Sequence, residues 1–404
     1  MFANRYIQSQ LFSFWVIVNT TMLCCVVHAQ DASSITLNSP IIIGLDADVS
    51  ASAKSGGIAI SQGAQLAIDE INRSGGLLGT TLKLVVKDHR GNPARGINNI
   101  EEFAELPNLA AVVGGVHTPV ALAELSTIHE KNIIYLGAWA AGTAIVDNTF
   151  VPNNVFRVSV RDEEAGQTLI QHAKQQGYHS VALVLERTGW GRSNLRSIGD
   201  AAENQGIRIA SVNWINWRQT DFTHEFNNIV NSKPDAIIMV TNAPEGAIVA
   251  KHMLAKQHHY PIISHWGIAG GQFTKLLGLD NLQGLQVSVL QTFHFNNTSH
   301  GSKREYLLKA YRKRYQNKVS AASIPAVVGI AQAYDIVHML AVAIKQANSI
   351  NSNDTRAALL NINEYHGAIK HYIKPFTINK QDALLGSDYF MTSFNTDGHL
   401  VPIN

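Results

Sequence analysis

From residue 40 onward, short runs of β-branched and other apolar residues alternate with longer segments that have helical periodicity. The segments predicted to be extended strands are 41–44, 82–87, 110–113, 132–136, 155–158, 180–185, 208–212, 236–240, 262–264 and 285–290. The helix predicted over 58–71 has one apolar face, made of Ile60, Ala64, Ala67, Ile68 and Ile71. A longer helical region is predicted over 325–347. Strands that alternate with helices form parallel sheets covered on both faces, so the pattern predicts an α/β fold.

The number of strand and helix units exceeds what one open sheet of ordinary size holds, which predicts two Rossmann-like lobes. Pro152-Asn153-Asn154, followed by an extended segment, indicates a crossing from one lobe to the other. The return is expected near 288–293. The turn-rich stretch 373–401 predicts a hairpin region without helices.

Residues 1–29 have the pattern of a secretory signal peptide, with one early charge at Arg5, an apolar middle and small residues at Val27 and Ala29. We expect cleavage after Ala29 and export of the mature chain to the periplasm. One alternative is a membrane anchor, which the polar residues 19–21 disfavour. Another is a lipoprotein, which the bulky Leu23 disfavours.

Cleavage at this position removes Cys24 and Cys25, so the mature chain has no cysteine and is indifferent to the redox state of its compartment. No segment after the signal peptide is expected to span a bilayer, and the mature protein is expected to be soluble. Charged residues make up 15% of the chain, and 32 Lys+Arg against 30 Asp+Glu leave a net charge of +2. That balance argues against a nucleic-acid partner.

The motifs that signal cofactor chemistry are absent from the sequence. It has no GxxxxGK[ST] or GxGxxG phosphate loop, no GxSxG and no HExxH, so we expect no cofactor and no enzymatic activity. His252, His258, His259 and His265 invite a metal interpretation. No Cys or carboxylate stands at ligand spacing from them, so surface or core roles are expected and no metal site is assigned.

Two glycine-containing turns follow predicted strands. In the segment 112–119 a strand and two glycines lead to Thr118 and Pro119, a typical helix start whose free amides attract an anion. A simple capped crossover helix explains this turn equally well. The second turn, 137–143, is rich in small residues and contains Trp139, either a wall for a ligand or a packed core residue.

Several stretches, in this order along the mature chain, carry a resemblance to a known family. They are 63–72 with Gly75, Gly76 and Gly79; Asp88 with 93–94; 112–114; 136–143; 184–185 with 189–191; 221–223; and 235–240 with 244–246. From Asp31 onward the chain is similar to the exported leucine/isoleucine/valine-binding proteins. These are type I periplasmic binding proteins, the substrate-binding subunits of ABC transporters.

The resemblance implies two α/β lobes joined by a three-crossing hinge, with one small ligand enclosed between them. The implied lobes are 30–156 plus 289–368 and 157–288 plus 369–404. A monomer that delivers an amino-acid-like, amide or carboxylate ligand to a membrane-embedded ABC permease is expected. The residues that match the family's ligand-binding positions are Ser50, Ser52, Gly56, His117, Thr118, Ala138, Trp139, Ala140, Trp190, Asn242 and Trp266.

One departure bears on the ligand. The family holds the ligand's α-ammonium with a glutamate in a Gly-Pro-Glu-Gly turn, whereas the matching turn here contains Trp266. Either the ligand has no α-ammonium, or another acid, with Glu245, Asp46 and Asp48 as candidates, neutralises it. Two other functions stay open: a ligand sensor for a membrane receptor or regulator, and an enzyme of unknown type that uses His117, His265 and Glu245.

Overall fold

The computed structural model describes residues 39–295, 301–315 and 320–403. The predicted signal peptide lies outside this range. One parallel sheet has the order β2-β1-β3-β4-β5. Its strands are β2 (Leu82–Asp88), β1 (Ile41–Ala47), β3 (Leu109–Gly114), β4 (Tyr135–Gly137) and β5 (Val155–Arg157).

A second sheet has the order β14-β13-β10-β9-β8-β6-β7, with β13 and β14 antiparallel to their neighbours. Its strands are β14 (Leu400–Pro402), β13 (Phe390–Phe394), β10 (Val287–Gln291), β9 (Ile262–Ser264), β8 (Ala236–Val240), β6 (Ser180–Glu186) and β7 (Arg208–Ile215). Strand β6 is buried along its whole length, as expected of a central parallel strand. The α/β class with two parallel-sheet lobes is therefore confirmed.

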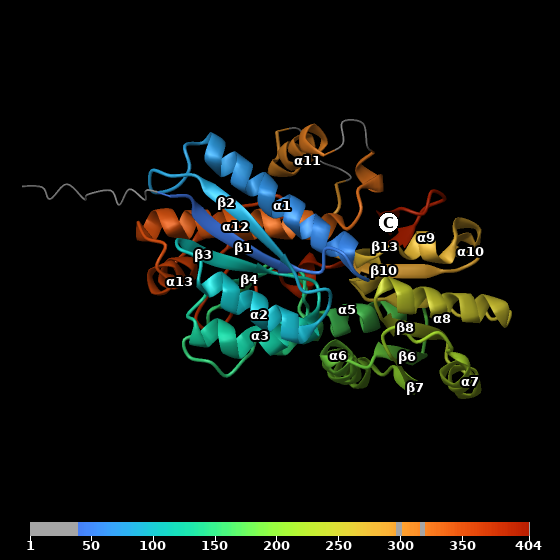
Figure 1. Ribbon diagram of the computed structural model, residues 1–404. Helices are drawn as coiled ribbons and strands as arrows, with labels where there is room; N and C mark the ends of the chain where they lie inside the picture. Colours follow the sequence, from blue (N-terminus) through green and yellow to red (C-terminus); the bar gives the residue numbers. More distant parts are fainter. Residues whose placement is uncertain (1–38, 296–300, 316–319, 404) are drawn as a thin grey trace, which may run out of the picture. The chain divides into compact units, whose positions relative to one another are not determined.

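Helices pack against both faces of each sheet (Figure 1). Those associated with the first sheet are α1 (Lys54–Arg73), α2 (Pro93–Ala104), α3 (Thr118–Glu130), α4 (Thr143–Val146), α11 (Lys303–Arg314), α12 (Val327–Ala347) and α13 (Ser352–Leu360). Those associated with the second are α5 (Asp162–Gln175), α6 (Gly189–Gln205), α7 (Thr223–Ser232), α8 (Ala243–Ala255), α9 (Phe273–Leu277) and α10 (Leu279–Gln283). Helices α1 and α12 approach each other so closely that a Cβ at Gly63 would lie 2.1 Å from the Ile330 carbonyl oxygen. Only glycine fits at this position.

Helix α12 corrects the expectation that no later segment has the length and composition to span a membrane. Among the described residues, α12 is the one helix long and apolar enough to cross a membrane, with a mean hydropathy of 1.7 over its most apolar window. However, 83% of that window is buried inside the protein. The same composition is expected of a central core helix, which is all-round apolar because it is all-round buried.

Four other local differences separate the sequence expectations from the structure. The strand expected over 132–136 begins only at Tyr135, because Asn132 has a positive φ of 49° after the end of α3. The C-terminal stretch contains a short 3-10 helix, Gly386–Asp388, although none was expected. A separate two-stranded sheet, β11 (Glu364–His366) with β12 (His371–Ile373), was not predicted. Strand β10 extends to Gln291, three residues past the lobe boundary expected after residue 288. The lobe boundaries themselves stay a prediction.

Two of the connecting segments lie side by side. Arg157 in β5 pairs in parallel with Asp382, and the Arg157 amide donates to the Gln381 carbonyl at 2.8 Å. The Ala383 amide returns a hydrogen bond to the Arg157 carbonyl at 2.8 Å. The segments that leave the first sheet and that return after β12 are therefore hydrogen-bonded to each other.

Candidate functional site

The candidate site lies at the carboxyl ends of the central strands of both sheets. In parallel sheets, ligands bind outside these ends at the point where the strand order reverses. In the first sheet that point lies between β1 and β3, which lead to Asp48 and His117. In the second sheet it lies between β6 and β8, which lead to Glu186 and Asn242.

Asp48 holds the first-sheet part of the site together. Its side chain is fully buried and accepts hydrogen bonds from the amides of Ala51 at 2.6 Å and Ala53 at 3.0 Å. His117 Nε2 lies 3.1 Å from Asp48 Oδ2, the same oxygen that accepts from Ala53. Burial alone would raise the pKa of Asp48, but the hydrogen bonds from His117, Ala53 and Ala51 outweigh it and lower the pKa to about 2.

Glu186 occupies the corresponding position in the second sheet. Its Oε1 accepts from the Asn242 amide and its Oε2 from Trp217 Nε1, both at 2.6 Å. Burial, together with the nearby charge of Glu245, raises the pKa of Glu186 to about 8. This carboxyl group is therefore mostly protonated, and neutral, at pH 7.

Tryptophan side chains from both halves of the chain surround the same space. Trp139 packs on Trp266 with ring centroids 5.1 Å apart, and Trp217 packs on His117 at 5.2 Å. Trp190 Nε1 donates to the buried Asp162 at 3.2 Å. Four of the five tryptophans in the described residues thus line one site.

The cavity that these side chains enclose is small. It is lined by Val116, His117, Thr118, Pro119, Trp139, Ala141, Glu186, Trp190, Trp217, Asn242, Trp266 and Gly267. Its volume of about 10 Å³ is room for about one water molecule. The side chains of the two sheets are therefore in contact across the site in this conformation.

Six of the eleven residues predicted to bind a ligand line this cavity: His117, Thr118, Trp139, Trp190, Asn242 and Trp266. The other five do not line it. Ser50 and Ser52 are exposed, and Ser50 Oγ donates to Asp88 Oδ2 at 2.5 Å. Gly56, Ala138 and Ala140 are buried but do not line the cavity. The Ala140 amide donates to the Gly115 carbonyl at 3.3 Å.

The sequence interpretation missed Glu186 and Trp217. Glu186 is the last residue of β6, and Trp217 lies two residues after the end of β7. An acid at the end of a fully buried strand such as β6 is the signal that would have indicated Glu186. Of the three acids considered as ammonium ligands, Asp48 caps the loop after β1, and Asp46 accepts from Asn99 Nδ2 at 2.6 Å. Glu245 Oε1 accepts from the Arg218 amide at 3.0 Å, and Glu245 does not line the cavity.

Three of the four histidines weighed as metal ligands have other contacts, and the fourth, His259, is exposed. His265 is fully buried, accepts from the Trp266 amide through Nδ1 at 2.8 Å and lies 3.3 Å from Asp162. His252 packs edge-on against Phe226, and His258 stacks on Tyr260. These contacts are those of core and surface side chains.

A wider cavity of about 320 Å³ lies elsewhere, lined by residues such as Ser55, Phe273, His294, Ile324 and Leu400. None of the eleven predicted residues lines it.

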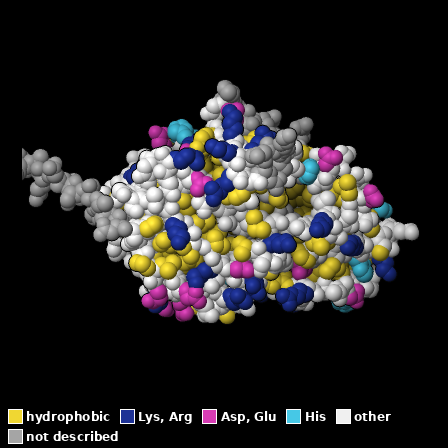
Figure 2. Space-filling view, turned by 45° about the horizontal axis from the view of Figure 1, so that its top comes forward, with side chains coloured by type: hydrophobic (Ala, Val, Ile, Leu, Met, Phe, Trp, Pro, Cys, Tyr) yellow, Lys and Arg dark blue, Asp and Glu magenta, His cyan; other side chains and the backbone are white. Residues whose placement is uncertain are grey.

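On the face shown in Figure 2, charged side chains of both signs are interspersed, and a hollow is bordered by hydrophobic side chains. No large field of one sign covers this face, in agreement with the small net charge.

The fold and the cleft together define a two-lobed protein of the solute-binding class. The Leu/Ile/Val-binding protein BraC3 of Rhizobium johnstonii is 24% identical over 321 residues, which are 79% of this chain and 83% of the relative. The type 1 periplasmic binding protein of Bordetella pertussis Tohama I superposes with a TM-score of 0.81 at 19% identity, covering 90% and 100% of the two chains. A solute-binding protein of an ABC transporter from Rhodopseudomonas palustris HaA2, in complex with p-hydroxybenzoic acid, superposes with a TM-score of 0.75 at 16% identity, covering 90% and 95%.

The family model for periplasmic binding proteins matches residues 40–399. The chain therefore belongs to the periplasmic binding protein family. This membership confirms the predicted family, and it makes the protein a substrate-binding protein rather than an enzyme.

Proposed function

We propose that this protein captures a small carboxylate with an aromatic or apolar body, lacking an α-ammonium group, and delivers it to an ABC transporter permease. The observation that carries the proposal is the set of four indoles, Trp139, Trp190, Trp217 and Trp266, around the cavity. Aromatic side chains offer large apolar area and stack on a flat ring. The site residues predicted from the sequence, including those outside the cavity lining, remain part of this proposal.

The charges around the cavity favour a ligand without an ammonium group. Glu186 is the acid in the cavity lining, and both of its oxygens already accept hydrogen bonds from the protein. Its raised pKa leaves it neutral at pH 7 in the ligand-free site. A buried ammonium would therefore find no ready counter-charge there, and an unpaired buried charge is costly.

The start of helix α3 suits a carboxylate. Thr118 and Pro119 both line the cavity at the first turn of this helix. Pro119 has no N–H, and the Val120 and Ala121 amides both donate to the His117 carbonyl at 3.1 Å. The Thr118 amide is therefore the first-turn donor that this helix offers a carboxylate, and the helix dipole adds positive potential there. His117, whose Nε2 contacts Asp48 Oδ2 at 3.1 Å, is the N-cap residue of this helix and also lines the cavity.

Transport by an ABC permease is supported by relatives, not by the cleft itself. The R. palustris protein is described as the solute-binding protein of an ABC transporter. A ligand that contacts both lobes stabilises the closed form through its differential affinity, and the permease would recognise that form.

The test is a thermal unfolding series on the mature protein, first unfolded and refolded to remove bound ligand. We expect 4-hydroxybenzoate, benzoate and phenylacetate to raise the unfolding midpoint by mass action, and leucine, isoleucine and valine to leave it unchanged. Indole fluorescence should change with the same ligands, because four of the five tryptophans of the described chain line the site.

The two parts of the proposal fail differently. A midpoint raised by leucine and not by any aromatic acid would overturn the ligand class and leave solute binding intact. No response to any small molecule, in protein shown to be ligand-free, would overturn solute binding in this cleft. Delivery is tested separately by ligand uptake into vesicles that hold the candidate permease, with and without the binding protein.

A further inference from the structure

The unpredicted hairpin β11–β12 brings together three side chains that are common metal ligands. In its register His366 lies opposite His371, and Glu364 lies opposite Ile373. Residues that are directly opposite, or two apart on one strand, share a face of a sheet. Glu364, His366 and His371 are therefore on one face, and all three are exposed.

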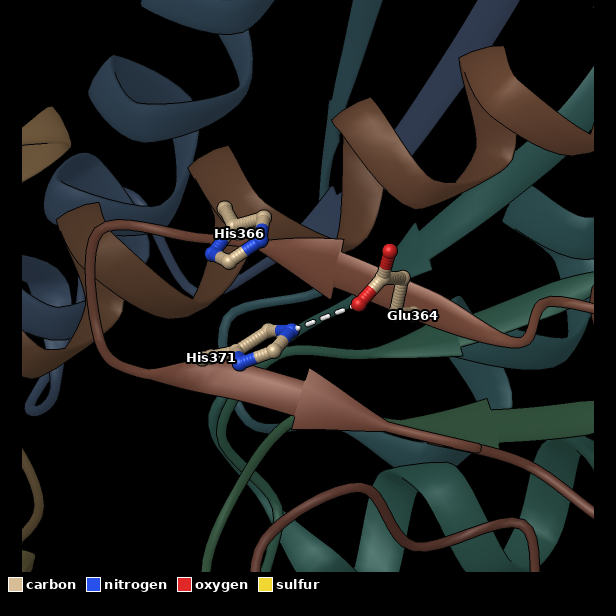
Figure 3. Close-up of side chains that lie close together, drawn as sticks. All are labelled: Glu364, His366 and His371. Atoms are coloured by element: carbon tan, nitrogen blue, oxygen red, sulfur yellow. Dashed lines mark hydrogen bonds and ion pairs between the residues drawn. The ribbon is translucent and has the colours of Figure 1, made fainter.

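The ligand atoms of these residues are close to one another (Figure 3). Taken one per residue, they all lie within 4.8 Å of one another. His371 Nε2 is 3.1 Å from Glu364 Oε2, and the rings of His366 and His371 stack with centroids 3.8 Å apart. Within the described parts of the chain, no other group of three His, Cys, Asp or Glu side chains meets this distance.

The hairpin is fixed from its other face. Buried Asp335 in α12 accepts hydrogen bonds from the amides of Ala368 at 2.7 Å and Ile369 at 3.0 Å, and from the Tyr372 hydroxyl at 2.9 Å. A Cβ at Gly367 would lie 2.4 Å from Asp335 Oδ2, so the turn packs directly on this carboxylate. The backbone that carries the two histidines is thus held in place before any ion arrives, which lowers the entropic cost of binding.

We propose that Glu364, His366 and His371 form a surface site for a divalent transition-metal ion, with Zn²⁺ as the principal ion. Two imidazoles and one carboxylate are a ligand set that zinc uses when it keeps a fourth position for water. Imidazole ligands suit zinc, copper and nickel, whereas Mg²⁺ and Ca²⁺ prefer oxygen ligands alone. Small rotations of these exposed side chains bring the three ligand atoms to one ion.

This site is separate from the proposed solute cleft, and its residues are different from those that line the cavity. The competing explanation is a stacked histidine pair with a solvent-exposed ion pair, which contributes little to stability. That explanation predicts no saturable metal binding by these residues. The two are therefore separable by direct titration.

The experiment is calorimetric titration of the metal-free, tag-free mature protein with Zn²⁺, with Mg²⁺ as the ion expected not to bind. We expect one saturable Zn²⁺ site per chain in the micromolar range, and weakening by roughly tenfold or more in His366→Ala and His371→Ala. Glu364→Ala should weaken it as well. The matched control is His224→Ala, since His224 is also exposed and lies outside the cluster.

Circular dichroism and the metal-free unfolding midpoint should be unchanged in all four variants, because the substituted side chains are exposed. The chain has 17 histidines, so weak binding alone does not support the site. Zn²⁺ binding that is absent, or that His366→Ala and His371→Ala leave unaltered, would overturn it. Zinc absorption-edge spectroscopy of the wild type should show two nitrogen ligands from imidazole and the remainder oxygen.

Discussion

At the scale of single residues, two buried carboxyl groups give opposite dependences of stability on pH. Asp48 is ionised and saturated with donors from the loop 50–53 and His117. Glu186 is held protonated by burial and by the charge of Glu245. The first stabilises the fold at neutral pH, and the second opposes it as the pH rises.

We expect Asp48→Asn to destabilise the protein by about 2 kcal/mol at pH 7. The pKa of Asp48 falls from 3.8 in the unfolded chain to about 2 in the fold. Its contribution is therefore complete above about pH 4 and is lost as the pH falls toward 2. Denaturant titrations of both proteins should show a stability gap that narrows over this range, and a gap of constant size from pH 7 to pH 2 would contradict the ionisation argument.

The charge of Glu245 is expected to increase the stability that the fold loses through Glu186 as the pH rises. Because the pKa of Glu186 rises from 4.5 to about 8, the fold loses stability as the pH rises between these values. Glu245→Gln keeps the oxygen that accepts from Arg218 and removes the charge, so it should lose less stability over the same window. The measurement is the unfolding midpoint from pH 5 to pH 9, with the exposed Glu203→Gln as a control that follows the wild type.

The tryptophans allow a matched pair of substitutions. Trp217 and Trp214 are both half-buried, and Trp217 lines the cavity whereas Trp214 does not. Trp217→Leu should weaken ligand binding roughly tenfold or more, because it removes a ring-stacking partner and the donor to Glu186. Trp214→Leu should bind with nearly wild-type affinity in the same titration. Equal losses in both would place Trp217 outside the binding surface.

At the scale of elements, the two hydrogen-bonded connecting segments carry a buried ion pair. Arg157 is fully buried, and its Nε donates to Asp382 Oδ1 at 2.5 Å. Its Nη1 donates to the carbonyls of Ala140 and Gly142, in the turn that holds Trp139. This one side chain therefore joins the connecting segments to the binding turn.

We expect Arg157→Met to cost about 3 kcal/mol, since the buried carboxylate of Asp382 then keeps the contact with Arg161 Nη1 at 3.1 Å and loses the closer one with Arg157. The double variant Arg157→Met with Asp382→Leu should lose less than the sum of the two single losses, because it buries no unpaired charge. Chemical denaturation of the four proteins gives the coupling energy. The exposed Arg208→Met should cost little, and additive losses in the cycle would show that the pair is not coupled.

How far the sequence predicts each element depends on burial. Strands such as β6 and β8 are buried along their length, so their continuous apolar runs indicated them correctly. Strand β11 carries Glu364 and His366 on its exposed face and has no apolar run, so nothing in the pattern indicated it. In the same way, motifs indicated several of the residues that line the cavity, and the acid that ends the apolar run of β6 is a signal for Glu186. That β6 ends beside strands of the other sheet is information about topology, which the pattern does not contain.

At the scale of the whole molecule, the small cavity sets a requirement on ligand entry. A space of about 10 Å³ holds about one water molecule and not an aromatic acid. Contacts such as Trp139 with Trp266 and Thr143 with Ser193 join elements of the two sheets across the site. A ligand must therefore enter a more open form, and ligand binding then shifts the population toward a closed one.

We expect small-angle scattering of the ligand-free mature protein to give a larger radius of gyration than the closed structure implies, and saturating ligand to reduce it. The physical reason is that open forms are populated unless a ligand contacts both lobes and favours closure by its differential affinity. Trp217→Leu should reach the same compact form at a higher ligand concentration, because the substitution changes affinity and leaves the connecting segments intact. Identical scattering curves with and without saturating ligand would show that the ligand enters without opening, and the cavity would then have to enlarge by local side-chain movement alone.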